Sequence, residues 1–231
     1  MSTADFRSGR FLKRVALPTL IGISALGALI GLLLVWAGRE ADDIAVSRQV
    51  ALANLVISNL RETIAHNQES VTVWDDAVEA VQHDDSAEWI DYTLGAWMHA
   101  YFGHDGAYVL DPADQPIYQF STMDIDEPYH DVEMVSAPLV AALREQLREG
   151  DETGLSDRIL SQGAADIGVV GGRPAVVSAK PIVSDTGEIE QTPGAEHIHV
   201  AVRYLDGDFL EELGRDYMFE DMRFQWAGEM P

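Results

Sequence analysis

Cysteine is missing from the whole chain of 231 residues, so neither disulfides nor thiolate metal sites can form. Lysine is almost missing too: only Lys13 and Lys180 occur, and arginine supplies the other positive side chains. The sequence also lacks a Gly-x-Ser-x-Gly nucleophile elbow and a glycine-rich phosphate-binding loop. Because these common catalytic signatures are missing, we expect no catalytic residues, no metal site, no cofactor and no enzyme activity in this chain.

Positive charge is scarce relative to negative charge. The chain has 39 Asp and Glu residues against 15 Lys and Arg residues, which gives a formal net charge of -24 at pH 7. Such a surface repels nucleic acid and anionic lipid, and it suits a salty medium that screens self-repulsion. We therefore expect no nucleic-acid partner and interpret the acidity as a trait of a saline habitat, with cation binding as the alternative.

One long run without charge lies near the N-terminus, over residues 15–36. At about 1.5 Å per helical residue it would reach roughly 30 Å, the hydrocarbon thickness of a bilayer. Basic residues precede it and acidic residues follow it, so the positive-inside rule keeps residues 1–14 in the cytoplasm and sends the main domain to the periplasmic or extracellular side. We therefore expect a transmembrane helix over residues 15–37 in the inner (cytoplasmic) membrane. A cleaved secretion signal is the alternative, but its apolar core is usually only about 7–15 residues long.

A helical stalk is predicted over residues 38–82, where apolar side chains recur at alternating steps of four and three. The first part of this seam consists of Val46, Val50, Ala53, Ile57, Leu60 and Ile64. The pattern fits either one helix to Gln82 or two helices that meet near residues 67–70. Such a seam can pack on its own domain or on a partner chain. With Gly27 and Gly31 four residues apart, we expect a homodimer through the transmembrane and stalk helices.

Residues 83–231 combine helical patterns with short strand-like runs, mostly arranged as hairpins. Helices are expected from about residue 85 to Gly103 with an aromatic stripe that suits a core, from Ser136 to residue 150 with Pro138 just inside, and over residues 208–213. Strands are expected over residues 107–110, 117–120, 166–170, 175–183 and 197–204. This order predicts an α+β domain with an antiparallel sheet of about five strands.

The order of several short motifs is similar to that of a known family. The motifs are VWDDA (73–77), YVLD (108–111), IY (117–118), GGRP (171–174), VVSAKPI (176–182) and VAVRYLD (200–206). Over residues 40–213 the chain resembles the CHASE type-4 (CHASE4) domain, the extracytoplasmic sensor of bacterial and archaeal signalling receptors. The resemblance implies a PAS/Cache-like domain that feeds a GGDEF or EAL cyclic-di-GMP enzyme, or a histidine kinase, outside this chain.

The Trp-Asp-Asp motif is the first candidate for binding a cue. On a helix, Trp74 lies on the apolar seam, while Asp75 and Asp76 point about 100° and 200° away from it. One carboxylate could therefore face a pocket and anchor a cationic or hydroxylated ligand. In the structural alternative, an aspartate caps a helix end or pairs with an arginine, and Trp74 belongs to the core.

Two cations and three tyrosines complete the candidate ligand-binding set. Arg173 and Lys180 could clamp a ligand carboxylate, although an arginine in a turn is often only solvated. Tyr108 and Tyr118, with Tyr204, could line the same cavity, although strand tyrosines are ordinarily half-buried packing residues.

Histidines raise the question of an exported metallohydrolase. His-Asp pairs occur at residues 83–84, 104–105 and 130–131, and His197 and His199 would share one face of a strand. Aspartate is so abundant that one such pair is expected by chance, and the predicted strands do not suit the all-helical metallohydrolase fold. We therefore expect a membrane-anchored sensory module that responds to an unidentified small molecule or physical cue. A membrane-tethered binding or scaffold protein without signalling output is the alternative, and the metallohydrolase ranks behind it.

Overall fold

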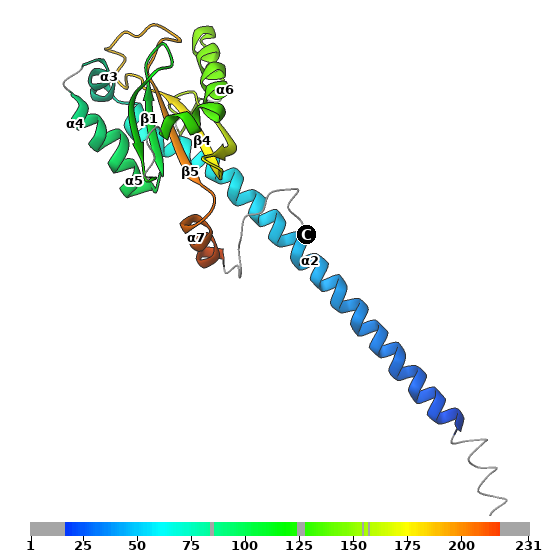
Figure 1. The fold of residues 1–231 in the computed structure, drawn as a ribbon. Helices are drawn as coiled ribbons and strands as arrows, with labels where there is room; N and C mark the ends of the chain where they lie inside the picture. The colour runs from blue at the N-terminus through cyan, green and yellow to red at the C-terminus, as the bar shows by residue number, and fades with distance from the viewer. Residues whose placement is uncertain (1–16, 84–85, 124–127, 154, 157, 218–231) are drawn as a thin grey trace, which may run out of the picture. The chain divides into compact units, whose positions relative to one another are not determined.

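The computed structural model describes residues 17–83, 86–123, 128–153, 155–156 and 158–217 (Figure 1). The chain divides into two compact units, residues 1–56 and 57–231, and helix α2 (Leu17–Thr72) contributes to both. Among the described residues, no helix is both long and apolar enough to cross a membrane. The transmembrane helix expected over residues 15–37 is therefore not confirmed, and its first two residues and the basic segment 1–14 lie outside the described residues.

The stalk is broken in two, but later than the sequence indicates. α2 ends at Thr72 and α3 (Asp75–Gln82) follows, so the break lies at residues 73–74 and not at residues 67–70. Val73 forms a parallel bridge with Val183, and the Trp74 N–H donates to the Val183 carbonyl over 2.9 Å. Val73, which is β-branched, therefore leaves the helix where its backbone pairs with another segment, and this pairing replaces the lost helical hydrogen bonds.

Five strands form one antiparallel sheet, as the sequence predicts. They are β1 (Gly106–Leu110), β2 (Pro116–Ser121), β3 (Ala164–Val170), β4 (Arg173–Pro181) and β5 (Ile198–Tyr204), in the spatial order β2-β1-β5-β4-β3. The β3–β4 turn needs positive φ, and Gly171 and Gly172 supply it with φ of 57° and 79°. The α+β fold class with an antiparallel sheet is therefore confirmed.

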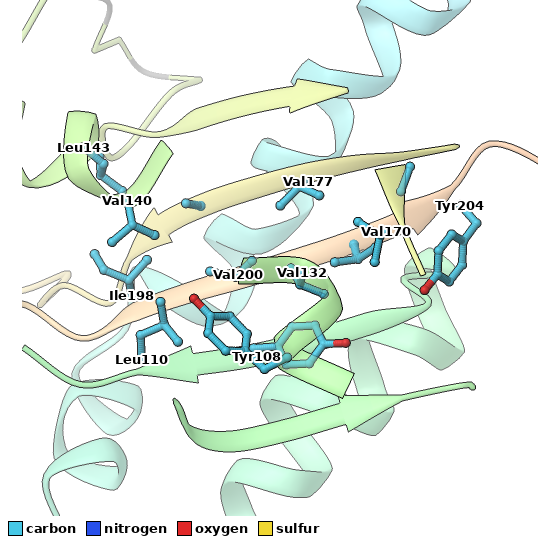
Figure 2. Close-up of a cluster of buried hydrophobic side chains, with 14 of the residues drawn as sticks. Tyr108, Leu110, Val132, Val140, Leu143, Val170, Val177, Ile198, Val200 and Tyr204 are labelled. Carbon is cyan, nitrogen blue, oxygen red and sulfur yellow. The ribbon is translucent and has the colours of Figure 1, made fainter. Parts of the chain in front are cut away.

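Helix α6 (Pro128–Glu149) covers one face of the sheet (Figure 1). Figure 2 shows Tyr108, Leu110 and Val200 of the sheet facing Val132, Val140 and Leu143 of this helix, all of them buried. The expected helix start at Ser136 is wrong, because α6 begins at Pro128 and holds Pro138 in its interior. Burial of Tyr129 and Val132 in the same core offsets the cost of an interior proline.

Short helical segments cover part of the opposite face. Where the sequence predicts a single helix, the structure has three consecutive segments: α4 (Ala87–Ile90), the π-helix η3 (Asp91–Ala96) and α5 (Trp97–Phe102). Gly103 ends the last of them with φ of 68°. Ile90, Leu94 and Met98 are buried against the sheet. Tyr101 is 70% exposed, so the aromatic stripe is only partly core.

The last turns of α2 pack on the same face, beside these segments. Ile64 is buried against Val176 and Ala201, and Leu60 packs on the same cluster. The C-terminal part of the seam is therefore used by the chain's own sheet. Val50, nearer the N-terminus, is 55% exposed. α7 (Asp208–Tyr217) follows β5 and extends the short helix expected over residues 208–213.

Candidate ligand-binding site

The larger of two cavities in the described part of the chain lies where β3 begins, and α2, β4 and the segment leading into β3 form its walls. It holds about 790 Å³, within the range of roughly 300–1,000 Å³ that is usual for small-molecule sites. Its lining includes Arg61, Ala65, Glu69, Arg158, Ser161 and Lys180. All of them belong to the unit of residues 57–231.

Lys180 is the innermost charged group of this cavity. Its side chain is 2% exposed, and Nζ donates to Oε1 of Glu69 and to the Ser161 carbonyl, both over 2.6 Å. Burial lowers the pKa of Lys180, whereas the Glu69 carboxylate opposes that shift. Gly163 makes room for the lysine stem, since a Cβ there would lie 2.5 Å from Cδ of Lys180.

Glu69 connects three segments of the fold at this point. Besides Lys180, its Oε1 accepts the N–H groups of Leu160 over 3.0 Å and Ser161 over 3.4 Å. The carboxylate therefore joins α2 to β4 and to the segment before β3. Sequence reasoning missed Glu69 because, at about 100° per residue, it lies well off the apolar seam, where helical periodicity predicts solvent.

A second polar link lies next to Glu69 in the same interface. Nε2 of Gln68 donates to Nδ1 of His199 over 2.9 Å and to its carbonyl over 3.0 Å. Because a carbonyl oxygen only accepts, Nε2 of His199 must be the protonated nitrogen that donates to Leu94 over 3.0 Å. Complete burial lowers the pKa of His199 to about 4, so the imidazole is neutral. This imidazole links α2, β5 and η3.

A smaller cavity of about 360 Å³ lies beside α7 and contains Arg173 and Arg203. Arg173 pairs with Asp206 and stacks 3.9 Å from the ring centroid of Tyr204. Arg203 donates to the Phe102 carbonyl and to Glu212, both over 2.7 Å. Both guanidinium groups are therefore engaged within the domain, which makes this cavity the weaker candidate.

The Trp-Asp-Asp motif holds a loop and lines neither of the two cavities described above. The carboxylate of Asp75 accepts hydrogen bonds from the hydroxyls of Ser184 and Thr186, and these bonds lower its pKa. Asp76 is exposed, and Trp74 is 36% exposed and packs on Trp89 with ring centroids 5.5 Å apart. Asp75 therefore has a structural role, but it neither caps a helix end nor pairs with an arginine, and Trp74 is not a core residue.

The remaining predicted residues do not share one cavity. Tyr108 is buried in the core under α6 and its ring lies 5.5 Å from that of Tyr129. Tyr118 packs on the opposite face, and its hydroxyl donates to Asp91 over 2.9 Å. Of the eight residues proposed from the sequence, Lys180 lines the large cavity, and Arg173 and Tyr204 line the small one.

The histidines have separate surroundings. No group of three or more His, Cys, Asp or Glu side chains within the described ranges is placed to hold a metal ion, and Asp84 lies outside those ranges. His104 is 1% exposed, and burial lowers its pKa to about 3. His197 precedes β5, near Asp111 and Arg144, whereas His199 is bonded to Gln68 and Leu94. The two imidazoles therefore have different neighbours.

The sequence of the chain matches the model of one known protein family. The model of the CHASE4 domain matches residues 56–225, which is most of the chain. The chain belongs to the CHASE4 family. CHASE4 domains are extracellular sensory domains of membrane signalling receptors, which agrees with a sensor module and with the absence of a predicted catalytic site. The match starts later than the expected residue 40 and ends later than the expected residue 213. No curated protein matches the chain.

Proposed function

We propose that this CHASE4 chain is the cue-binding module of a membrane-anchored receptor, and that the cue binds in the cavity beside Lys180. The observation that carries the proposal is that α2 forms a wall of this cavity. Arg61, Ala65 and Glu69 of α2 line it, and Glu69 is bonded to the sheet and to the segment before β3. A ligand that displaces any of these contacts changes how the end of α2 packs.

The route of the signal follows from the same helix. A cue shifts an equilibrium only if it binds one arrangement of α2 better than another, and the two must lie within a few kcal/mol. The uncharged run over residues 15–36 supports a membrane anchor with residues 1–14 in the cytoplasm and the sensory domain outside. The exposed Val50 supports a homodimer through the stalk. The output is a cyclic-di-GMP enzyme of the GGDEF or EAL type, or a histidine kinase.

Thiol labelling in intact cells tests the location that this function requires. Since the chain has no cysteine, one introduced cysteine is the only reactive thiol. We expect His66→Cys, in the wall of the cavity, and Ala113→Cys, in the exposed β1–β2 turn, to react with a membrane-impermeant maleimide in intact cells. Ser8→Cys is expected to react only after permeabilisation, and the chain is expected in the membrane fraction.

The opposite pattern contradicts the proposal. If His66→Cys and Ala113→Cys are protected in intact cells but react in lysates, the domain is not outside the membrane. Recovery of the intact chain in the soluble fraction would contradict the anchor.

A further inference from the structure

We propose that the cavity beside Lys180 binds an organic anion, namely a carboxylate with an apolar body. This assignment rests on the proposed sensory function and names the ligand class of the same site. It is carried by hydrogen-bond donors in the cavity wall that have no partner and by the apolar side chains around them.

The unpartnered polar atoms of this wall are able to donate. Oγ of Ser161 and Nε of Arg61 are buried without a hydrogen-bond partner in the described part of the chain, and both residues line the cavity. Nε of arginine can only donate, and a serine hydroxyl can donate. The Lys180 ammonium has three N–H groups, of which Glu69 and the Ser161 carbonyl accept two. A ligand that satisfies these atoms must therefore supply acceptor oxygens.

The charge of the wall favours an anion over a neutral acceptor. Three cationic side chains, those of Arg61, Arg158 and Lys180, line the cavity, and the acids of its lining are Glu62 and Glu69. Lys180 pairs with Glu69, and Arg61 pairs with Asp166 through Nη2 over 2.8 Å, which leaves Nε of Arg61 for a ligand. In the whole chain, by contrast, 39 acidic residues oppose 15 basic ones. Hydrogen bonds to an ionised acceptor are shorter and stronger than neutral ones, so a carboxylate gains more here than an amide or an alcohol.

The rest of the wall requires an apolar body. Apolar side chains line the same cavity from α2, from the segment before β3 and from β3 itself. They are those of Ala65, Leu155, Ile159, Ala164 and Ala165. Ile159 is 48% exposed, so covering it with a ligand removes apolar surface from water. The volume exceeds what an inorganic anion would fill. An organic acid satisfies both the donors and these walls.

Three small molecules that share a six-carbon chain but differ in their head group test whether the cavity prefers a carboxylate. We expect isothermal titration calorimetry on the full chain in detergent to show binding of hexanoate, and much weaker binding of hexanamide and hexylamine. Ser161→Ala removes an unpartnered hydroxyl and is expected to weaken hexanoate binding by about tenfold. Ser178→Ala is the matched control, because Oγ of Ser178 is also buried and unpartnered but does not line the cavity.

A cavity-filling variant separates this assignment from the proposed function. Ala65→Phe is expected to abolish hexanoate binding, whereas Ala141→Phe, on the exposed face of α6, leaves it unchanged. If hexanamide or hexylamine binds as well as hexanoate and Ala65→Phe abolishes that binding, the cavity keeps its sensory role but the anion assignment is wrong. Failure of hexanoate to bind, equal effects of Ser161→Ala and Ser178→Ala, or insensitivity to Ala65→Phe would also overturn it.

Discussion

At the scale of single residues, the contact between α2 and the sheet is polar at its centre. Gln68, Glu69 and Thr72 of α2 and Ser178, Lys180 and His199 of the sheet are all buried. Buried polar groups cost free energy unless they are paired, and Lys180 with Glu69 and Gln68 with His199 are paired. This interface therefore depends on geometry more than an apolar one does, which suits an element that changes its packing when a ligand binds.

The neutral state of His199 makes part of the stability pH-dependent. Burial lowers its pKa from 6.5 to about 4, so between these values the unfolded chain binds a proton that the folded chain does not. The stabilisation is fully present above pH 6.5 and is lost as pH falls towards about 4. At roughly 1.4 kcal/mol per pKa unit, this loss is about 3 kcal/mol.

A variant without the His199 imidazole separates its contribution to the pH dependence of stability from those of the carboxylates and of His104. We expect the free energy of unfolding in urea to fall less on acidification from about pH 7 to about pH 5 in His199→Phe than in the wild type. His104 is also neutral when buried, but it is present in both proteins. Parallel pH profiles for the two proteins would mean that His199 is protonated in the folded state.

Of the two residues in the buried ion pair, one could be proposed from the sequence and the other could not. Lys180 attracts notice because only two lysines occur in the chain, and the structure does place it in a cavity. Glu69 is one of 39 acids, and its position on the helix predicts a solvated side chain. The cavity combines residues that lie as far apart in the sequence as Arg61 and Lys180, so no local sequence pattern could have revealed it.

At the scale of elements, η3 lies in close contact with β2 at Gly95. Gly95 permits this contact, because a Cβ at this position would lie 1.8 Å from the Tyr118 hydroxyl oxygen and 2.9 Å from Cζ. The same hydroxyl donates to Asp91, at the start of η3. The π-helix and the Tyr118 side chain therefore fit one another.

Gly95→Ala is expected to destabilise the fold by about 1–3 kcal/mol, although alanine is the better helix former. The reason is the overlap with Tyr118, which has to move and to give up its bond to Asp91. Urea unfolding measures the change. In a Tyr118→Phe background, which lacks the hydroxyl, the same substitution is expected to cost less. An equal cost in both backgrounds would show that the overlap is not the cause.

The elements themselves could be predicted where their periodicity is local. Alternating strands and glycine turns place all five strands to within a few residues. The start of α6 could not be predicted, because Pro138 is typical of a first helical turn and only contacts with the sheet bury Tyr129 and Val132. The stalk break depends on the pairing of Val73 with Val183, a residue more than a hundred positions away.

At the scale of the whole molecule, α2 joins the cavity to the part of the stalk that we propose pairs two chains. The C-terminal end of the stalk seam packs on the chain's own sheet through Leu60 and Ile64. Val50, on the same seam, is 55% exposed, and we propose that it contacts a second copy. The central claim is that filling the cavity alters the packing of α2 and thereby the contact between the copies.

Disulfide crosslinking in membranes tests this claim most directly. Val50→Cys is expected to crosslink two copies, and Arg48→Cys, which lies about 160° around the helix from Val50, is expected to crosslink far less. Introducing Ala65→Phe should change the yield at Val50→Cys, whereas Ala141→Phe should leave it as in the parent. Equal yields at both cysteine positions, or a yield at Val50→Cys that filling the cavity leaves unchanged, would contradict the account.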